Sequence, residues 1–177
     1  MDKKIILLTG IHGVGKGYLA EQIKDKVKIP IYEASDLIKK IANDVETHKK
    51  VKDIKKNQNI LYESIKTVVL DDFFILDGHT CLLNKDGKIE KIDLISLKKL
   101  NIIGVICLYD DAKQIKKRLI KRDSYIYSEK LLTEFQQAEL SNAKQLALEQ
   151  KIPFMKYKAN SNIELIMDFI RGIMEDI

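Results

Sequence analysis

The chain has 177 residues, of which 45% are hydrophobic and 32% are charged, a composition that excludes a disordered or fibrous protein. The net charge is +5, from 31 basic and 26 acidic residues, with no long basic run, so we expect a polyanionic small molecule rather than nucleic acid as the partner. The two cysteines, Cys81 and Cys107, lack C-x-x-C spacing, and no apolar run nears the roughly 20 residues of a membrane span. We therefore expect a reduced, cytoplasmic protein with no membrane partner.

Apolar runs and helical patterns alternate along the chain. In chain order they predict a strand over Lys3–Thr9, a helix over Tyr18–Val27, a strand over Lys28–Tyr32, a helix over Asp36–Asn43 with Ser35 as its N-cap, a helix over Ile60–Leu70 and a strand over Phe73–Leu76. There follow a small hairpin at Asn84–Ile89, a strand over Ile102–Tyr109, helices over Ala112–Lys121 and Glu129–Lys151, a strand over Phe154–Tyr157 and a helix over Asn162–Asp176. This alternation predicts a parallel sheet covered on both faces, with ligands at the carboxyl ends of its strands.

The loop after the first predicted strand carries the sharpest functional signal. From Gly10 to Lys16 it reads G-x-x-x-x-G-K, the phosphate-binding loop of nucleotide-binding proteins. Glycines let the backbone wrap closely around phosphate oxygens, and the start of the following helix attracts anions. The Ser or Thr that normally follows the lysine and binds Mg²⁺ is replaced by Gly17, and Tyr18 comes next.

The loop resembles that of the adenylate kinase and UMP/CMP kinase superfamily, which commonly runs G-x-P-G-x-G-K-G-T. The glycine after the lysine is a variant of that superfamily, so the loop is not broken. His12 stands in place of the proline and Tyr18 in place of the threonine, which removes a hydroxyl from its usual position. The resemblance implies that ATP is bound by Gly10, His12, Gly13, Val14, Gly15, Lys16, Gly17, Tyr18 and Arg118.

Two further segments extend the resemblance toward the acceptor. The sequence E-A-S-D-L-I-K at Glu33–Lys39 resembles the segment that holds the acceptor monophosphate, which implies that Ser35 and Lys39 contact the acceptor. A solvated helix lysine is the alternative for Lys39. Asp-x-His at Asp77 and His79 resembles archaeal-type adenylate kinases and the coilin-interacting nuclear ATPase group.

The Asp-x-His resemblance implies that Asp77 holds Mg²⁺ through water and that His79 contacts the substrate. A strand-end turn residue is the alternative for Asp77, and a structural role is the alternative for His79. Cys81 stands where adenylate kinases carry the acceptor-site arginine that contacts phosphate, and the loss of that arginine favours an ATPase over a kinase.

An arginine pair lies between the fourth predicted strand and the predicted lid. Arg118 and Arg122 are four residues apart, and so share one helical face. In the resembled family, one arginine of such a pair stacks on the adenine and the other contacts the transferred phosphate, where positive charge accelerates phosphoryl transfer. A solvated basic face is the alternative. Glu139, which has a counterpart in the nuclear-ATPase group, is expected to be structural or solvated.

The resemblance implies a P-loop α/β fold with a five-stranded parallel sheet of order 2-3-1-4-5, helices on both faces and a short lid. We expect one domain over residues 1–177, with a mobile insertion at about 36–70 and the lid at about 121–130. The implied function is transfer of the γ-phosphoryl group of MgATP to a nucleoside monophosphate, AMP being favoured, with Lys16, Asp77, Arg118 and Arg122 as catalytic residues. A slow ATPase or a nucleotide-sensing module that acts with a macromolecular partner is the alternative, and the motifs are also compatible with an AAA-type ATPase.

Overall fold

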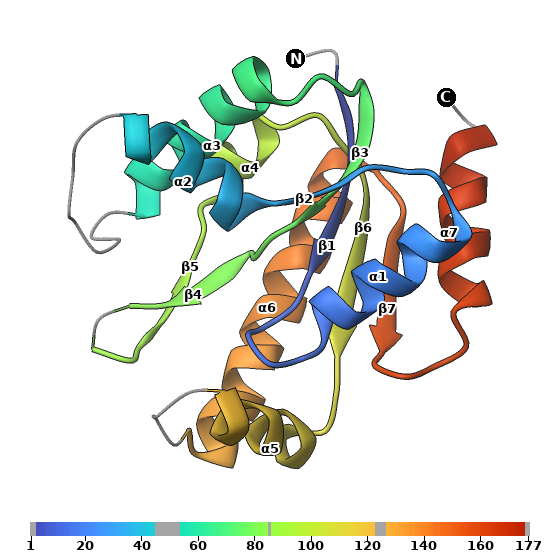
Figure 1. Cartoon of the computed structure of the whole chain (residues 1–177). Coiled ribbons are helices and arrows are strands. Elements are labelled where there is room, and N and C mark those ends of the chain that lie inside the picture. Colours follow the sequence, from blue (N-terminus) through green and yellow to red (C-terminus); the bar gives the residue numbers. More distant parts are fainter. Residues whose placement is uncertain (1–2, 45–53, 85, 123–126, 176–177) are drawn as a thin grey trace.

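Five parallel strands form the central sheet of the protein. The structure, a computed structural model, describes residues 3–44, 54–84, 86–122 and 127–175. The strands of the sheet are β1 (Lys4–Thr9), β2 (Ile31–Glu33), β3 (Phe73–Asp77), β6 (Ile102–Tyr109) and β7 (Phe154–Lys158). They run in the order β2-β3-β1-β6-β7, and each pairing is parallel (Figure 1). Counted within this sheet alone, the order is 2-3-1-4-5, as predicted.

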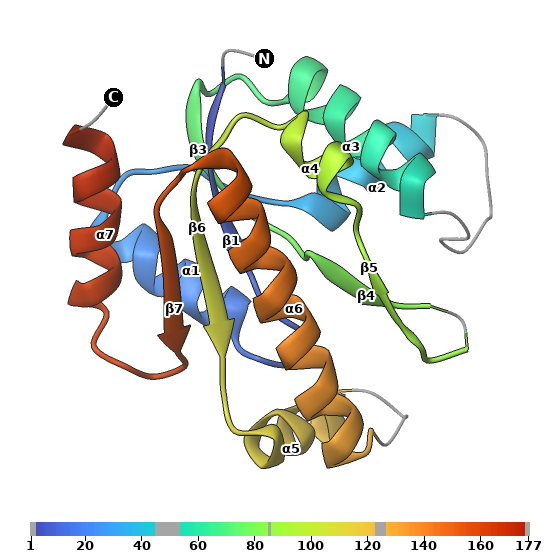
Figure 2. The same cartoon turned by 180° about the vertical axis from the view of Figure 1, so that it is seen from behind.

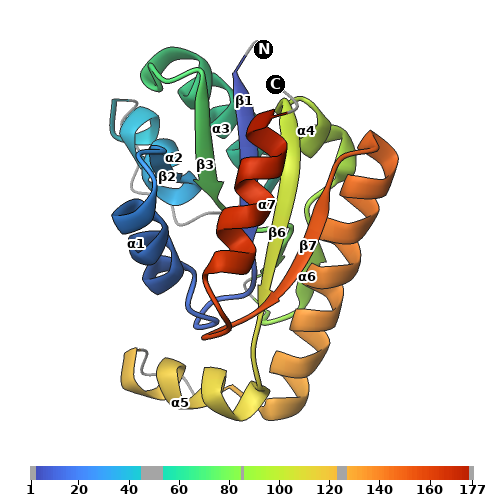
Figure 3. The same cartoon turned by 90° about the vertical axis from the view of Figure 1, so that its right-hand side faces the viewer.

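Helices cover both faces of the sheet. They are α1 (Lys16–Lys26), α2 (Ala34–Asp44), α3 (Ile54–Val68), α4 (Leu94–Lys98), α5 (Ala112–Arg122), α6 (Glu129–Gln150) and α7 (Glu164–Glu175). Figure 3 shows α1 and α7 on one side of the sheet and α6 on the other. Among the described residues, no helix combines the length and the apolar character that crossing a bilayer requires.

The continuous apolar run of β1 builds a hydrophobic core on each face. Ile6 and Leu8 pack in one cluster with residues of α1 and α7, whereas Leu7 packs in a second cluster with Ile65 of α3 and Leu97 of α4. Successive side chains of a strand point to opposite faces, so a strand that is covered on both sides must be apolar at every position. This is why the sheet was predictable from sequence.

The ends of several elements differ from the prediction. Strand β2 begins only after Pro30, which has no N–H to donate to the sheet. Ser35 was expected to cap a helix but lies inside α2, because β2 ends at Glu33 and α2 starts at the next residue. Helix α4 was not predicted; its N-cap is Asp93, whose side chain accepts hydrogen bonds from the backbone N–H groups of Ile95 and Ser96.

The predicted hairpin is confirmed. Strands β4 (Cys81–Leu83) and β5 (Ile89–Lys91) pair antiparallel, and Gly87 in their turn has φ 73°, a conformation that favours glycine. The hairpin lies against α6, as Figure 2 shows. Residues 45–53, inside the predicted insertion, and residues 123–126, inside the predicted lid, lie outside the described part of the chain.

Candidate active site

The phosphate-binding loop connects β1 to α1 at the carboxyl edge of the sheet. Gly13 and Gly15 have φ angles of 78° and 109°, which side chains rarely adopt. A Cβ at Gly13 would also lie 2.7 Å from the Leu119 Cγ atom of α5, so glycine is needed here for packing as well. Gly17 differs, because a Cβ there would meet no atom within 4 Å.

Lys16 and Asp77 face each other beneath this loop. The Lys16 side chain donates from Nζ to the Gly10 carbonyl oxygen at 2.9 Å and lies 3.6 Å from Asp77 Oδ1. Burial lowers the pKa of Lys16, and the Asp77 charge partly opposes this. Burial raises the pKa of Asp77, while Lys16 opposes the rise and Glu33 adds to it. Glu33 is the partner of Asp77 in the β2–β3 register, so two carboxylates end adjacent strands.

Two imidazoles pack together beside the lysine. The ring centroids of His12 and His79 are 4.3 Å apart. Burial, and then the charges of Lys16 and His12, hold the pKa of His79 well below its usual range, although a hydrogen bond to the Gly10 backbone opposes this. Its Nδ1 atom is buried and has no hydrogen-bond partner among the described residues. His79 is therefore an uncharged imidazole at neutral pH.

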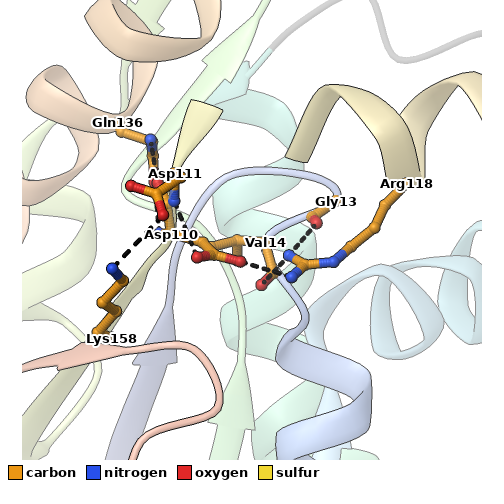
Figure 4. Close-up of polar contacts among 7 residues, drawn as sticks. All are labelled: Gly13, Val14, Asp110, Asp111, Arg118, Gln136 and Lys158. Atoms are coloured by element: carbon orange, nitrogen blue, oxygen red, sulfur yellow. Dashed lines mark hydrogen bonds and ion pairs between the residues drawn. The ribbon is translucent and has the colours of Figure 1, made fainter. Parts of the chain in front are cut away.

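Arg118 ties α5 to the back of the phosphate loop (Figure 4). Its guanidinium donates to the carbonyl oxygens of Gly13 at 3.2 Å and Val14 at 3.0 Å, and it also forms an ion pair with Asp110. Asp110 is fixed in turn, since Gln136 of α6 accepts from its N–H and donates to its carbonyl oxygen, both at 2.9 Å. The guanidinium therefore supports the shape of the loop.

A cavity of about 620 Å³ joins these groups. The predicted site residues that line it are His12, Gly13, Gly15, Lys16, Gly17, Ser35, Lys39, Asp77, His79, Arg118 and Arg122. Gly10, Val14 and Tyr18 do not line it. Val14 is fully buried, whereas Tyr18 is 65% exposed, and its hydroxyl accepts a hydrogen bond from Gln22 at 3.5 Å. Lys39 is exposed and forms an ion pair with Asp36 at 3.0 Å.

Comparisons with known proteins agree with this geometry. The sequence matches a family described as the AAA domain over residues 9–133, from the end of β1 into α6. The chain belongs to the AAA-domain family. With its phosphate-binding loop and sheet order, this AAA-domain protein is a P-loop NTPase of kinase-like fold. The comparison with curated proteins finds no match.

One solved structure shows how far the fold is shared. A gluconokinase from Sinorhizobium meliloti 1021 superimposes on this AAA-domain chain with a TM-score of 0.54, covering 98% of this chain and 93% of that chain. The two sequences are 13% identical. At that identity the likeness establishes the fold alone.

Of the two roles expected for Glu139, the structural one is confirmed in this AAA-domain site. It is 1% exposed, so the solvated role is wrong. Its Oε1 accepts from the backbone N–H groups of Gly10 at 3.1 Å and Thr80 at 3.0 Å and from the Thr9 hydroxyl, and its Oε2 accepts from the Cys81 N–H at 2.6 Å. These hydrogen bonds could not be predicted from a polar residue in a helical pattern, because the partners lie up to 130 positions away in the sequence.

The position expected for Cys81 is corrected by the structure. The resemblance put it in the acceptor site in place of an arginine, but its side chain is 0% exposed in the core and does not line the cavity. Burial, together with the nearby Glu139, raises the pKa of its thiol to about 12. The physical reason is that successive side chains of a strand point to opposite faces. In β4 the Cys81 side chain points into the core, and its neighbour Leu82 lines the cavity.

Proposed function

We propose that this protein transfers the γ-phosphoryl group of MgATP to a nucleoside monophosphate, with AMP as the first candidate, as a cytoplasmic enzyme of small-molecule metabolism. The observation that supports the proposal is that one cavity extends from the phosphate-binding loop to α3 and β4. It includes Lys16 and Asp77 and also Leu61 and Leu82 of elements remote from the phosphate loop. A plain ATPase needs only the loop end, so the remaining volume supports a second substrate.

The loop residues fit the phosphates of ATP. The loop conformation and the N-terminus of α1 suit an anion, and Lys16 is within reach of the β- and γ-phosphates by analogy with the motif. Mg²⁺, when bound, neutralises charge on the phosphates. Asp77 is the residue we assign to hold it through water, since hard cations prefer carboxylate oxygen.

We assign other residues to bind the acceptor and to stabilise the transferred phosphoryl group. Ser35 and Lys39 of α2 are assigned to the acceptor, and Arg122 to the charge on the moving phosphoryl group. A phosphate acceptor is already anionic and needs no strong general base. We further propose that residues 1–177 act as one domain.

A slow ATPase that acts with a macromolecular partner is the second candidate. Its support from the sequence was Cys81 in the acceptor site, and that support is withdrawn because Cys81 is buried elsewhere. A different observation favours it: the uncharged His79 has an Nδ1 atom with no partner among the described residues. Such a nitrogen can accept a hydrogen bond from an attacking water once ATP binding uncovers it, because it is buried in this structure.

The experiment measures ADP formation from MgATP with and without AMP. We expect AMP to raise the rate at least tenfold and ADP to appear from both nucleotides. Lys16→Ala serves as the inactive background, because it removes the cation that contacts the phosphates. ADP release at one rate, with or without acceptor, would refute the kinase and support the ATPase.

A further inference from the structure

Tyr18 carries an exposed aromatic ring two positions after the lysine of the phosphate-binding loop. It is 65% exposed and packs with neither core cluster. The other tyrosines of the described chain are buried, packed against a core cluster or covered by a lysine: Tyr32, Tyr62, Tyr109, Tyr127 and Tyr157. Single exposed apolar side chains are common on protein surfaces, so the argument for a ligand depends on where this ring lies.

The backbone at Tyr18 belongs to the phosphate site. Helix α1 begins at Lys16 with Gly15 as its N-cap, and no side chain caps it. The Leu19 N–H donates to the Gly15 carbonyl oxygen at 3.1 Å, so the N–H groups of Lys16, Gly17 and Tyr18 precede the helical hydrogen bonds. Such N–H groups at the start of a helix bind phosphate oxygens. The Tyr18 ring therefore lies within one side-chain length of a bound phosphate.

The geometry of phosphoryl transfer indicates which end of the nucleotide lies near this ring. The attacking and leaving oxygens are roughly in line, so the nucleoside of the donor points away from the acceptor. Asp77 lines the cavity that we assign to the acceptor, and Tyr18 does not. The ribose and base of the donor therefore leave the loop on its exposed side, where the Tyr18 ring lies.

The arginine that the resemblance assigned to ATP is held against the loop. The Arg118 guanidinium donates to the carbonyl oxygens of Gly13 and Val14 and pairs with Asp110 (Figure 4). The Tyr18 hydroxyl, in contrast, accepts one hydrogen bond from Gln22 at 3.5 Å, which is long for such a bond and costs little to break. The ring can therefore turn toward a base, and every nucleobase has a flat face that stacks on an aromatic ring.

We propose that Tyr18 stacks on the base of the phosphoryl donor and determines how tightly this site binds nucleoside triphosphates. This rests on the proposed function, because it takes ATP to be the donor bound at the loop. Stacking depends on the face of a base and not on the hydrogen-bonding groups at its edge. The site should therefore bind GTP within about tenfold of ATP.

Calorimetric titration in the presence of Mg²⁺ separates the base from the phosphates. The ligands are non-hydrolysable analogues of ATP and GTP, which carry both parts, and inorganic tripolyphosphate, which has no base. Tyr18→Leu removes the aromatic ring, so we expect it to weaken binding of the ATP analogue at least about fivefold. The GTP analogue should lose a similar factor, and tripolyphosphate should bind the variant within about twofold of the wild-type protein.

Two further variants identify the part of the side chain that acts. Tyr18→Phe keeps the ring and loses the hydroxyl, so it should bind the ATP analogue within about twofold of the wild type. Gln22→Ala is the matched control, because it removes the partner of that hydroxyl one turn further along α1, and it should also stay within about twofold. Tyr18 packs with no core cluster, so its variants should fold, and an unchanged ligand-free Tm checks this.

Three results would overturn the inference. Tyr18→Leu could bind the ATP analogue as tightly as the wild type, it could lose tripolyphosphate by the same factor as the analogue, or Tyr18→Phe could lose as much affinity as Tyr18→Leu. Because these experiments measure binding alone, the proposed function can fail separately. ADP release that is independent of AMP would refute the kinase and leave the stacked base in place.

Discussion

Glu139 is a single buried carboxylate that holds three segments of the chain together: the end of β1, the phosphate loop and the start of β4. Both of its oxygens accept hydrogen bonds from backbone N–H groups. Glu139→Gln would turn an amide NH₂ toward at least one N–H donor, leaving buried groups unpaired. We expect the free energy of unfolding to fall by about 1–3 kcal/mol, measured by urea denaturation.

The control for this change lies on the same helix. Glu134 is 52% exposed and lies 3.9 Å from Lys130, so Glu134→Gln should alter stability by less than about 0.5 kcal/mol. If Glu139→Gln were as mild as Glu134→Gln, acceptance of hydrogen bonds by both carboxyl oxygens would not be what holds the loop to α6.

His79 predicts a dependence of stability on pH. Its pKa in the folded state lies well below the usual value, chiefly because of burial, so below about pH 6.5 the unfolded chain binds a proton that the folded chain does not. Unfolding free energy should therefore fall as the pH drops from about 6.5, by up to about 1.4 kcal/mol per pH unit from this group. His79→Gln removes the titration, so its urea stability between pH 5 and 7.5 should fall less steeply. Parallel curves for the two proteins would count against a buried neutral His79.

At the scale of elements, α5 presents two arginines with different tasks. Both line the cavity, but Arg118 also donates to the loop carbonyl oxygens of Gly13 and Val14. Arg118→Ala should therefore raise the KM for ATP and lower kcat together. Arg122→Ala should lower kcat at least tenfold with little change in ATP affinity, since charge that acts only in the transition state affects rate alone.

Steady-state kinetics on both arginine variants would check this division. Lys121→Ala is the control, because Lys121 is an exposed cation of the same helix and does not line the cavity. Equal losses in Lys121→Ala and Arg122→Ala would mean that net positive charge, rather than a specific contact, supports turnover. An unchanged KM in Arg118→Ala would contradict its support of the loop.

The sequence allowed us to predict those elements and residues whose signals are local. The glycines and Lys16 are recognisable because the loop chemistry needs them at fixed spacing, and Asp77 because it ends an apolar strand. Helix α4 was missed since its five residues are too few to show a helical period, although Asp93 could have signalled the cap. Leu82 was missed because assigning the cavity wall to it depends on the phase of a three-residue strand, and a shift of one residue reverses its faces.

At the scale of the whole molecule, the parallel sheet decides which groups meet. Strands β1, β2 and β3 point the same way, so the phosphate loop, Glu33 and Asp77 gather at one edge although they lie far apart in the chain. Contacts such as that of Glu139 with Thr9, across 130 positions, arise only after this topology has formed. They follow from the fold and carry no local pattern, which is why the loop could be predicted and its support could not.

The same topology predicts that ATP stabilises the whole chain. A ligand that binds only the native state at 100 times its dissociation constant adds about 2.7 kcal/mol to the unfolding free energy. For a chain of 177 residues this corresponds to a rise in Tm of roughly 5–11 °C, measurable by differential scanning fluorimetry with MgATP.

Lys16→Ala should abolish most of this rise. Lys16 is 8% exposed, donates to the Gly10 carbonyl oxygen and lies 3.6 Å from Asp77, so its loss should lower the ligand-free Tm, and the shift with MgATP is measured from the variant's own ligand-free Tm. Lys24→Ala is the matched control, because Lys24 lies on the same helix in an exposed ion pair with Glu21. It should keep the full shift. If Lys16→Ala kept the full shift as well, ATP would bind somewhere other than the loop between β1 and α1, and the assignment of both substrate sites would fail with it.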